Sequence, residues 1–155
     1  MTSLKDTLHA DLTAAMRGGD AETVRTVRMV LTAIAQAEVS GTAAHELSHD
    51  DEVAILTTEL KRRRESAEAF AAAGRTELAE GELAEAAVIQ RYLPAPLTDD
   101  EVVALIADAV AQAQAQGLTG GRAMGAVMKS LKPATAGRVD GGTLAASVKL
   151  ALGMG

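Results

Sequence analysis

The sequence predicts an all-α protein of about seven helices arranged in two subdomains. Alanine is the commonest residue, at 33 of 155 positions, and proline occurs only three times, a composition that favours helices. Apolar residues recur every three or four positions along most of the chain, and no segment alternates in the manner of a half-buried strand. A chain of this length can bury a substantial core.

Two helices are expected first. The N-terminal one ends at Gly18-Gly19, because paired glycines interrupt its apolar pattern. The second begins at Asp20, whose side chain can accept hydrogen bonds from the free N–H groups of the first turn. It ends before a predicted loop at residues 40–42. The two apolar stripes consist of Leu4, Leu8, Leu12 and Met16, and of Val24, Val27, Leu31 and Ile34.

The next two helices are predicted to form a long antiparallel hairpin that turns at Gly74. Ser48 and the acidic residues after it favour a helix start, since carboxylates stabilise the positive end of the helix dipole. This helix runs to Gly74, and its partner extends from about Arg75 to Tyr92.

Arg63 is expected to form a salt bridge inside this hairpin. Facing residues have numbers that sum to about 148, twice the turn position, which places Arg63 opposite Glu85. Arg63 also lies on the apolar face of its helix, with Glu59 one turn before it. Because a partly buried charge needs a partner, we interpret four residues as structural ion pairs that fix the register, with a ligand-binding role as the alternative. They are Glu59, Arg63, Glu82 and Glu85.

The segment Leu93-Pro94-Ala95-Pro96 is the predicted boundary between the subdomains, since each proline removes an N–H donor and restricts the residue before it. We therefore expect an N-terminal helical bundle at residues 1–95 and a small C-terminal three-helix module at residues 96–155. The module's first helix is expected to open with a capping box at residues 98–101. A short second helix should stop at Pro133, and the third should be capped by Asp140 or Thr143.

Several classes of function lack the residues that they need. With no cysteine, the chain can form no disulfide, thiolate zinc site or thiol nucleophile. It contains neither a Gly-x-Ser-x-Gly nucleophile elbow nor a Gly-x-x-x-x-Gly-Lys-Ser/Thr phosphate loop, and Phe70 and Tyr92 are too few aromatic rings for a base-stacking module. His45 and His49 have the spacing of two metal ligands on a helix, but no third ligand accompanies them. No metal or cofactor is predicted.

A stand-alone enzyme is therefore not expected. Glu82 and Glu85 could serve as paired catalytic acids, but the cationic run at residues 61–64 on the facing helix offers them partners. The N-terminus lacks the apolar region of a signal peptide, and no apolar run is long enough to span a membrane. We expect a cytoplasmic protein without membrane contact.

The charge distribution gives the first functional indication. The chain has a formal charge of −6, and residues 1–92 carry 10 Lys and Arg against 16 Asp and Glu. Residues 118–155 carry five cations and one acid, a net charge of +4. A basic end of this kind can face nucleic-acid phosphates. Its cations are Arg122, Lys129, Lys132, Arg138 and Lys149.

Short motifs in a fixed order run through nearly the whole chain. They are Leu12, Ala15-Met16, Val27-Arg28-Met29, Glu59-Leu60-Lys61-Arg62-Arg63, Glu65-Ser66, Ala73-Gly74-Arg75, Leu78, Glu82, Glu85, Tyr92-Leu93-Pro94, Met124-Gly125, Val127-Met128 and Gly137-Arg138-Val139-Asp140-Gly141. Each piece is short, but their order and spacing together are specific. With them, the chain resembles the GatB/YqeY family.

The resemblance implies an all-helical protein similar to the C-terminal tail of the GatB component of the glutamine-dependent tRNA amidotransferase, an enzyme that converts misacylated Glu-tRNA or Asp-tRNA to the amide form. The tail is implicated in holding the tRNA body, and the catalytic chemistry lies outside it. Ala126 stands where family members often have a lysine. The tRNA-facing residues that the resemblance carries over are Gly121, Met124, Gly125, Lys129, Arg138 and Asp140.

We therefore predict a non-catalytic tRNA-binding or accessory module, with tRNA or an aminoacyl-tRNA-handling enzyme as its partner. Two alternatives stay open: a protein–protein adaptor that docks through the long hairpin, and a carbon–nitrogen ligase or amidase-type activity with glutamine as amido donor, which the family label implies. The predicted nucleic-acid site joins the carried-over residues to the basic segment and comprises Gly121, Arg122, Met124, Gly125, Lys129, Lys132, Arg138, Asp140 and Lys149.

Overall fold

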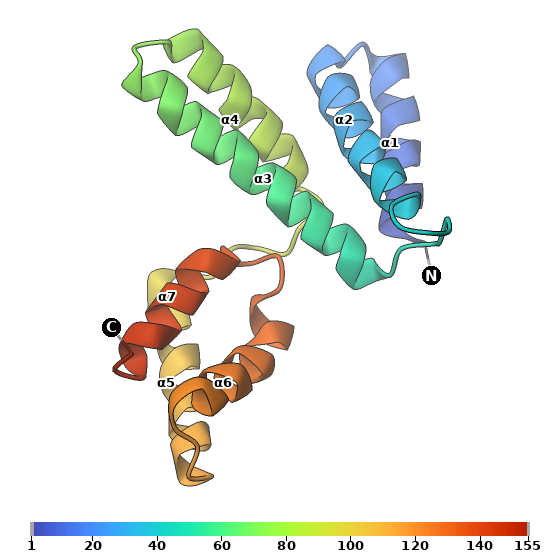
Figure 1. Cartoon of the computed structure of the whole chain (residues 1–155). Helices are drawn as coiled ribbons and strands as arrows, with labels where there is room; N and C mark the ends of the chain where they lie inside the picture. Colours follow the sequence, from blue (N-terminus) through green and yellow to red (C-terminus); the bar gives the residue numbers. More distant parts are fainter. Residues whose placement is uncertain (1, 155) are drawn as a thin grey trace. The chain divides into compact units, whose positions relative to one another are not determined.

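The computed structural model describes residues 2–154, and this part of the chain forms seven α-helices and no strand, which confirms the all-α prediction. The chain divides into two compact units, unit 1 (Met1–Pro94) and unit 2 (Ala95–Gly155). Unit 1 holds the first four helices and unit 2 the last three (Figure 1). The helices are α1 (Leu4–Gly18), α2 (Ala21–Glu38), α3 (His49–Ala72), α4 (Thr76–Gln90), α5 (Asp99–Ala115), α6 (Gly120–Thr135) and α7 (Gly141–Ala151).

Unit 1 consists of two helical hairpins, α1 with α2 and α3 with α4 (Figure 1). Their starts follow from local sequence. Ser3 and Ser48 each form a capping box with the aspartate three residues later, and Asp20 accepts a hydrogen bond from the Thr23 N–H at 3.1 Å. The turn between α3 and α4 needs Gly74, whose φ of 73° lies in the left-handed region that L side chains avoid.

The core of unit 1 joins all four helices. Leu8, Val27, Ile34, Leu56 and Ile89 have no exposed surface. The expected burial of Met16 is wrong, because its side chain is 55% exposed and Ala15 is buried instead. Each four-residue step on a helix rotates by about 40° beyond a full turn. A strict four-residue stripe therefore turns away from the core by its fourth member.

Tyr92 ties the end of unit 1 back to its first helix. Its hydroxyl donates a 2.5 Å hydrogen bond to the Asp11 carboxylate on α1. Burial is the main cause that raises the pKa of Tyr92 above its ordinary value, and the hydrogen bond to Asp11 adds to it.

Unit 2 packs α6 and α7 against α5 (Figure 1). Its core comprises Ile106, Ala109, Val110, Ala113, Val127, Leu131, Leu144 and Val148. Thr98 caps α5 by accepting from the Glu101 N–H at 3.2 Å. The Glu101 carboxylate accepts from the Thr98 hydroxyl at 3.1 Å, so the two side chains form a variant of the expected capping box.

The prediction that the sixth helix stops at Pro133 is wrong. Helix α6 includes Pro133 and continues to Thr135. Proline removes one N–H donor, which leaves the carbonyl of Lys129 without its helical partner. Lys129 and Pro133 are both exposed, so water can replace that hydrogen bond, and the helix ends only where Gly137 adopts a φ of 72°.

Candidate nucleic-acid interface

One face of α6 carries three cations in a row. Arg122, Lys129 and Lys132 are exposed, as is Gly125 between them. Gly125, Lys129 and Lys132 follow Arg122 by three, seven and ten residues. These separations place all four residues on one side of the helix, over about 15 Å along its axis. The opposite side of α6 is buried through Ala123, Val127 and Leu131. We call Arg122, Gly125, Lys129 and Lys132 the α6 stripe.

The α6 stripe has no acidic neighbours on its own helix. Residues 120–135 contain no Asp or Glu. None of the stripe's three cations forms an ion pair with any residue between positions 2 and 154. The acids of unit 2 lie elsewhere, four of them on α5 and one before α7: Asp99, Asp100, Glu101, Asp108 and Asp140. Unit 2 therefore separates its charges by helix and leaves the stripe free to bind an anion.

Two glycines in the first half of α6, Gly121 and Gly125, have no structural reason to be glycine, unlike Gly120, whose φ of 57° lies in the left-handed region. Gly121 and Gly125 have ordinary helical backbones, and a Cβ added at either would meet nothing within 4 Å. Glycine inside a helix costs about 0.5–1 kcal/mol relative to alanine. Both residues are exposed, and neither has a side chain that would cover the α6 backbone at its position.

Arg138 is committed to the fold of unit 2. Its Nε donates to the carbonyl of Ala95 at 2.9 Å, and its Nη1 donates to the carbonyl of Ala134 at 3.4 Å. The backbone carbonyl of Arg138 accepts from the Leu97 N–H at 2.9 Å. The side chain is half-buried. Arg138 thus holds the segment before α5 against the turn between α6 and α7.

The remaining predicted residues divide between structural positions and open surface. Asp140 caps α7, accepting from both the N–H and the hydroxyl of Thr143 at 2.9 Å. Met124 is partly buried and packs on the unit 2 core. Lys149 is exposed, on α7 and outside the α6 stripe. The structure brings together four of the nine predicted site residues, the members of the α6 stripe.

A groove that the sequence did not reveal adjoins the stripe. It has a volume of about 380 Å³ and lies between α5 and α6. The sequence signal for it is a pair of glutamines four residues apart, Gln112 on α5 and Gln116 directly after the end of α5. We call it the α5–α6 groove; its lining residues are Ala109, Gln112, Ala113, Gln116, Ala126, Lys129 and Ser130.

The carboxylates of unit 1 that could have acted as catalytic acids are bound by arginines. Arg63 contacts Glu59 at 3.1 Å, Glu82 at 3.5 Å and Glu85 at 3.5 Å. Arg25 on α2 contacts the second oxygen of Glu85 at 3.2 Å. This cluster links α2, α3 and α4, and its acids serve as partners for arginines.

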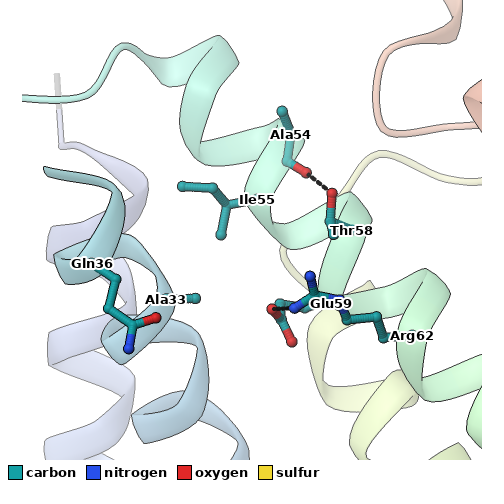
Figure 2. A pocket seen from close by; sticks show the side chains of 7 residues that line it. All are labelled: Ala33, Gln36, Ala54, Ile55, Thr58, Glu59 and Arg62. Atoms are coloured by element: carbon teal, nitrogen blue, oxygen red, sulfur yellow. Dashed lines mark hydrogen bonds and ion pairs between the residues drawn. The ribbon is translucent and has the colours of Figure 1, made fainter. Parts of the chain in front are cut away.

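A second groove lies between α2 and α3 in unit 1, with a volume of about 320 Å³ (Figure 2). Glu59 lines it, but Arg62 and Arg63 each bind one of its two carboxylate oxygens at 3.1 Å. The Thr58 hydroxyl beside it donates to the carbonyl of Ala54 at 3.0 Å, as Figure 2 shows. The groove therefore offers no unengaged acid or nucleophile from these residues.

The two histidines with metal-ligand spacing do not share a helix. His45 lies in the loop before α3, and His49 is the first residue of α3. Between residues 2 and 154, no group of three or more His, Cys, Asp or Glu side chains is placed to hold a metal ion. Among the same residues, no helix combines the length and the apolar character that crossing a membrane requires.

Comparison with known proteins agrees with the sequence resemblance. The family model described as "Yqey-like protein" matches residues 5–152. A curated relative from Meyerozyma guilliermondii, "Altered inheritance of mitochondria protein 41, mitochondrial", is 40% identical over 91 residues, which cover 57% of this chain and 45% of that protein. The match thus spans less than half the length of the relative.

Proposed function

Because the chain belongs to the Yqey-like protein family, we propose that it is a non-catalytic tRNA-binding or accessory module that meets the tRNA backbone with the α6 stripe. The observation that carries this proposal is the row of three exposed cations, unpaired within residues 2–154, beside an exposed backbone at Gly125. Phosphate contacts of this kind position a nucleic acid without reading its sequence.

The strength of such binding follows from the number of cations. Each phosphate neutralised on a duplex contributes about −0.9 to the slope of log affinity against log salt. Three stripe cations would therefore give a slope of about −3, and Lys149 could add a further contact. Binding of this size is modest and suits a module that assists a larger enzyme, such as one that handles aminoacyl-tRNA.

The state of the carboxylates supports a role without catalysis. Glu59, Glu82 and Glu85 each contact an arginine, and a general acid or base needs a side chain free to exchange its proton with substrate. We therefore do not favour the carbon–nitrogen ligase activity. We also propose a cytoplasmic location, although the name of the Meyerozyma guilliermondii relative describes a mitochondrial protein.

A protein adaptor is the second candidate, and the surface that favours it lies on α1 and α2 instead of the α3–α4 hairpin expected from the sequence. A groove of about 570 Å³ lies along α1 and α2, with Met16 (55% exposed) and Val24 among its apolar lining and Arg25 and Arg28 beside them. Grooves of this kind accept the apolar face of a partner helix.

The test measures binding of bulk tRNA to the full-length protein across a salt series. We expect micromolar affinity and a negative slope of log affinity against log salt. The double variant Lys129→Glu/Lys132→Glu should lose at least tenfold in tRNA affinity at low salt, since two contacts become repulsive. The control pairs two charge reversals at exposed cations of unit 1, Arg75→Glu and Arg17→Glu, which change the net charge equally. Equal losses in both variants, or no binding by the wild type, would overturn the proposal.

Arg138 is unsuitable for this test. Its guanidinium holds the carbonyl of Ala95, so its replacement would disturb the fold of unit 2 together with any effect on binding. The two lysines make no such contact within the described chain, and their replacement isolates the surface charge.

A further inference from the structure

We propose that the α5–α6 groove receives one unstacked nucleobase of the RNA whose phosphates lie on the α6 stripe. This inference rests on the proposed function and adds a second contact to it. The stripe alone would treat every RNA of equal charge alike, whereas a base-binding groove would favour RNA that contains unpaired nucleotides.

The size and floor of the groove fit a planar heterocycle. Its volume of about 380 Å³ falls within the range of about 300–1,000 Å³ that small-ligand pockets occupy. Ala109 and Ala113 are buried on α5, and Ala126 is half-buried on α6. These three small side chains form the apolar part of the lining, which we call the floor, and the lining also includes the longer side chains of Gln112, Gln116 and Lys129. A base could lie against this floor without an aromatic partner.

The rim of the groove carries hydrogen-bonding groups suited to the edge of a base. Gln112 donates its amide N–H to Asp108 at 3.2 Å, which leaves its amide oxygen to accept. Ser130 donates to the carbonyl of Val127 at 3.0 Å, so its hydroxyl oxygen can also accept. Gln116 is exposed and supplies both donors and an acceptor. These groups are the complement of the N–H donors and carbonyl acceptors on an unpaired base.

Lys129 connects the groove to the α6 stripe, because it belongs to both. A phosphate bound at Lys129 therefore brings its own nucleotide to the mouth of the groove. Gly125 precedes Ala126 of the floor and presents no Cβ, so the RNA backbone can approach α6 closely at this point. The arrangement puts phosphate contact and base contact within one nucleotide of each other.

The experiment compares two fluorescently labelled RNAs with the same number of phosphates, a hairpin with an unpaired loop and a fully paired duplex. Anisotropy titrations use the full-length protein at low salt. We expect the hairpin to bind about fivefold to tenfold more tightly, the effect of one or two net hydrogen bonds. The variants Ala126→Leu, which fills the groove, and Gln112→Ala/Gln116→Ala should bind both RNAs with the affinity that the wild type has for the duplex.

The matched control is Ala111→Leu, an exposed alanine on the face of α5 opposite the groove, which should keep the preference for the hairpin. Thermal melts establish that all variants fold. Equal binding of hairpin and duplex by the wild type, or a preference that survives both groove variants, would overturn the base-binding inference and leave the phosphate contacts intact. Absence of binding to both RNAs would overturn the proposed function and the inference with it.

Discussion

Arg63 organises the charges of unit 1. One guanidinium lies within 3.1–3.5 Å of carboxylates from Glu59, Glu82 and Glu85, and its side chain is only 20% exposed. Three acids in a partly buried space would repel one another without it. The pairing therefore follows from the cost of leaving buried charge uncompensated.

Replacing Arg63 by methionine should destabilise the protein strongly. The methionine keeps apolar contact, but the carboxylates lose their shared partner, and breaking a buried ion pair costs about 3–5 kcal/mol. Urea unfolding measures the loss. The control is Arg64→Met on the same helix, where Arg64 is exposed and bonds Gln90 at 3.1 Å; we expect a loss below about 1 kcal/mol there. Similar losses in the two variants would contradict the role of Arg63.

Tyr92 should make stability depend on alkaline pH. Burial first, and the bond to Asp11 second, raise its pKa above the ordinary 10.0. The folded state therefore favours the protonated phenol. The stability that this preference adds is fully present below pH 10.0, and it is lost as the pH rises through the higher pKa of the folded state. Tyr92→Phe should lose about 1–2 kcal/mol at neutral pH. The difference in free energy of unfolding between variant and wild type should shrink above pH 10.0, as urea unfolding at a series of pH values would show. A difference that stays constant with pH would contradict this role of Tyr92.

Helix α6 has a regularly spaced buried face and an exposed face that contains residues of low helix propensity. Its buried residues follow helical spacing, while its exposed side contains Gly121, Gly125 and Pro133, three residues of low helix propensity. Neither conformation nor space requires Gly125. A helix that keeps such residues on its cationic side gives up stability where we propose that it binds.

Gly125→Ala should separate stability from binding. Alanine has the higher helix propensity and meets nothing within 4 Å, so the variant should gain about 0.5–1 kcal/mol. The melting temperature should rise by about 2–4 °C for each kcal/mol gained. Affinity for tRNA should fall, because the added methyl group blocks close approach of the RNA backbone. Unchanged affinity in the stabilised variant would show that the glycine serves no ligand.

Across the molecule, the acidic charge and the cationic surface belong to different parts of the chain. The net charge is −6, and residues 1–92 account for that excess. Long-range attraction to RNA is therefore weak, and any affinity must come from short-range contacts of the α6 stripe. The charge-matched control in unit 1 tests this point, since it changes the net charge and leaves the stripe intact.

Much of the fold could be predicted because the deciding signals are local. Ser48, Asp20 and Thr98 begin helices through bonds to N–H groups three residues away, and Gly74 ends α3 because of its own φ. Capping and turn chemistry depend on residues within one helical turn, so a single sequence contains the information. The family, too, could be predicted from short motifs, and the family model matches residues 5–152.

Local patterns along the chain were enough to predict the all-α class, the family and the approximate positions of the helices, although the end of α6 was predicted too early. Only the tertiary structure shows which of the C-terminal cations are available to bind a ligand. Arg138 donates to a carbonyl 43 residues away in the chain, whereas Lys129 and Lys132 are exposed. The same holds for Gln112 and Ser130, which line one groove although they belong to different helices. Capping acts within one turn, whereas the availability of a side chain depends on packing between helices far apart in sequence, which no local pattern encodes.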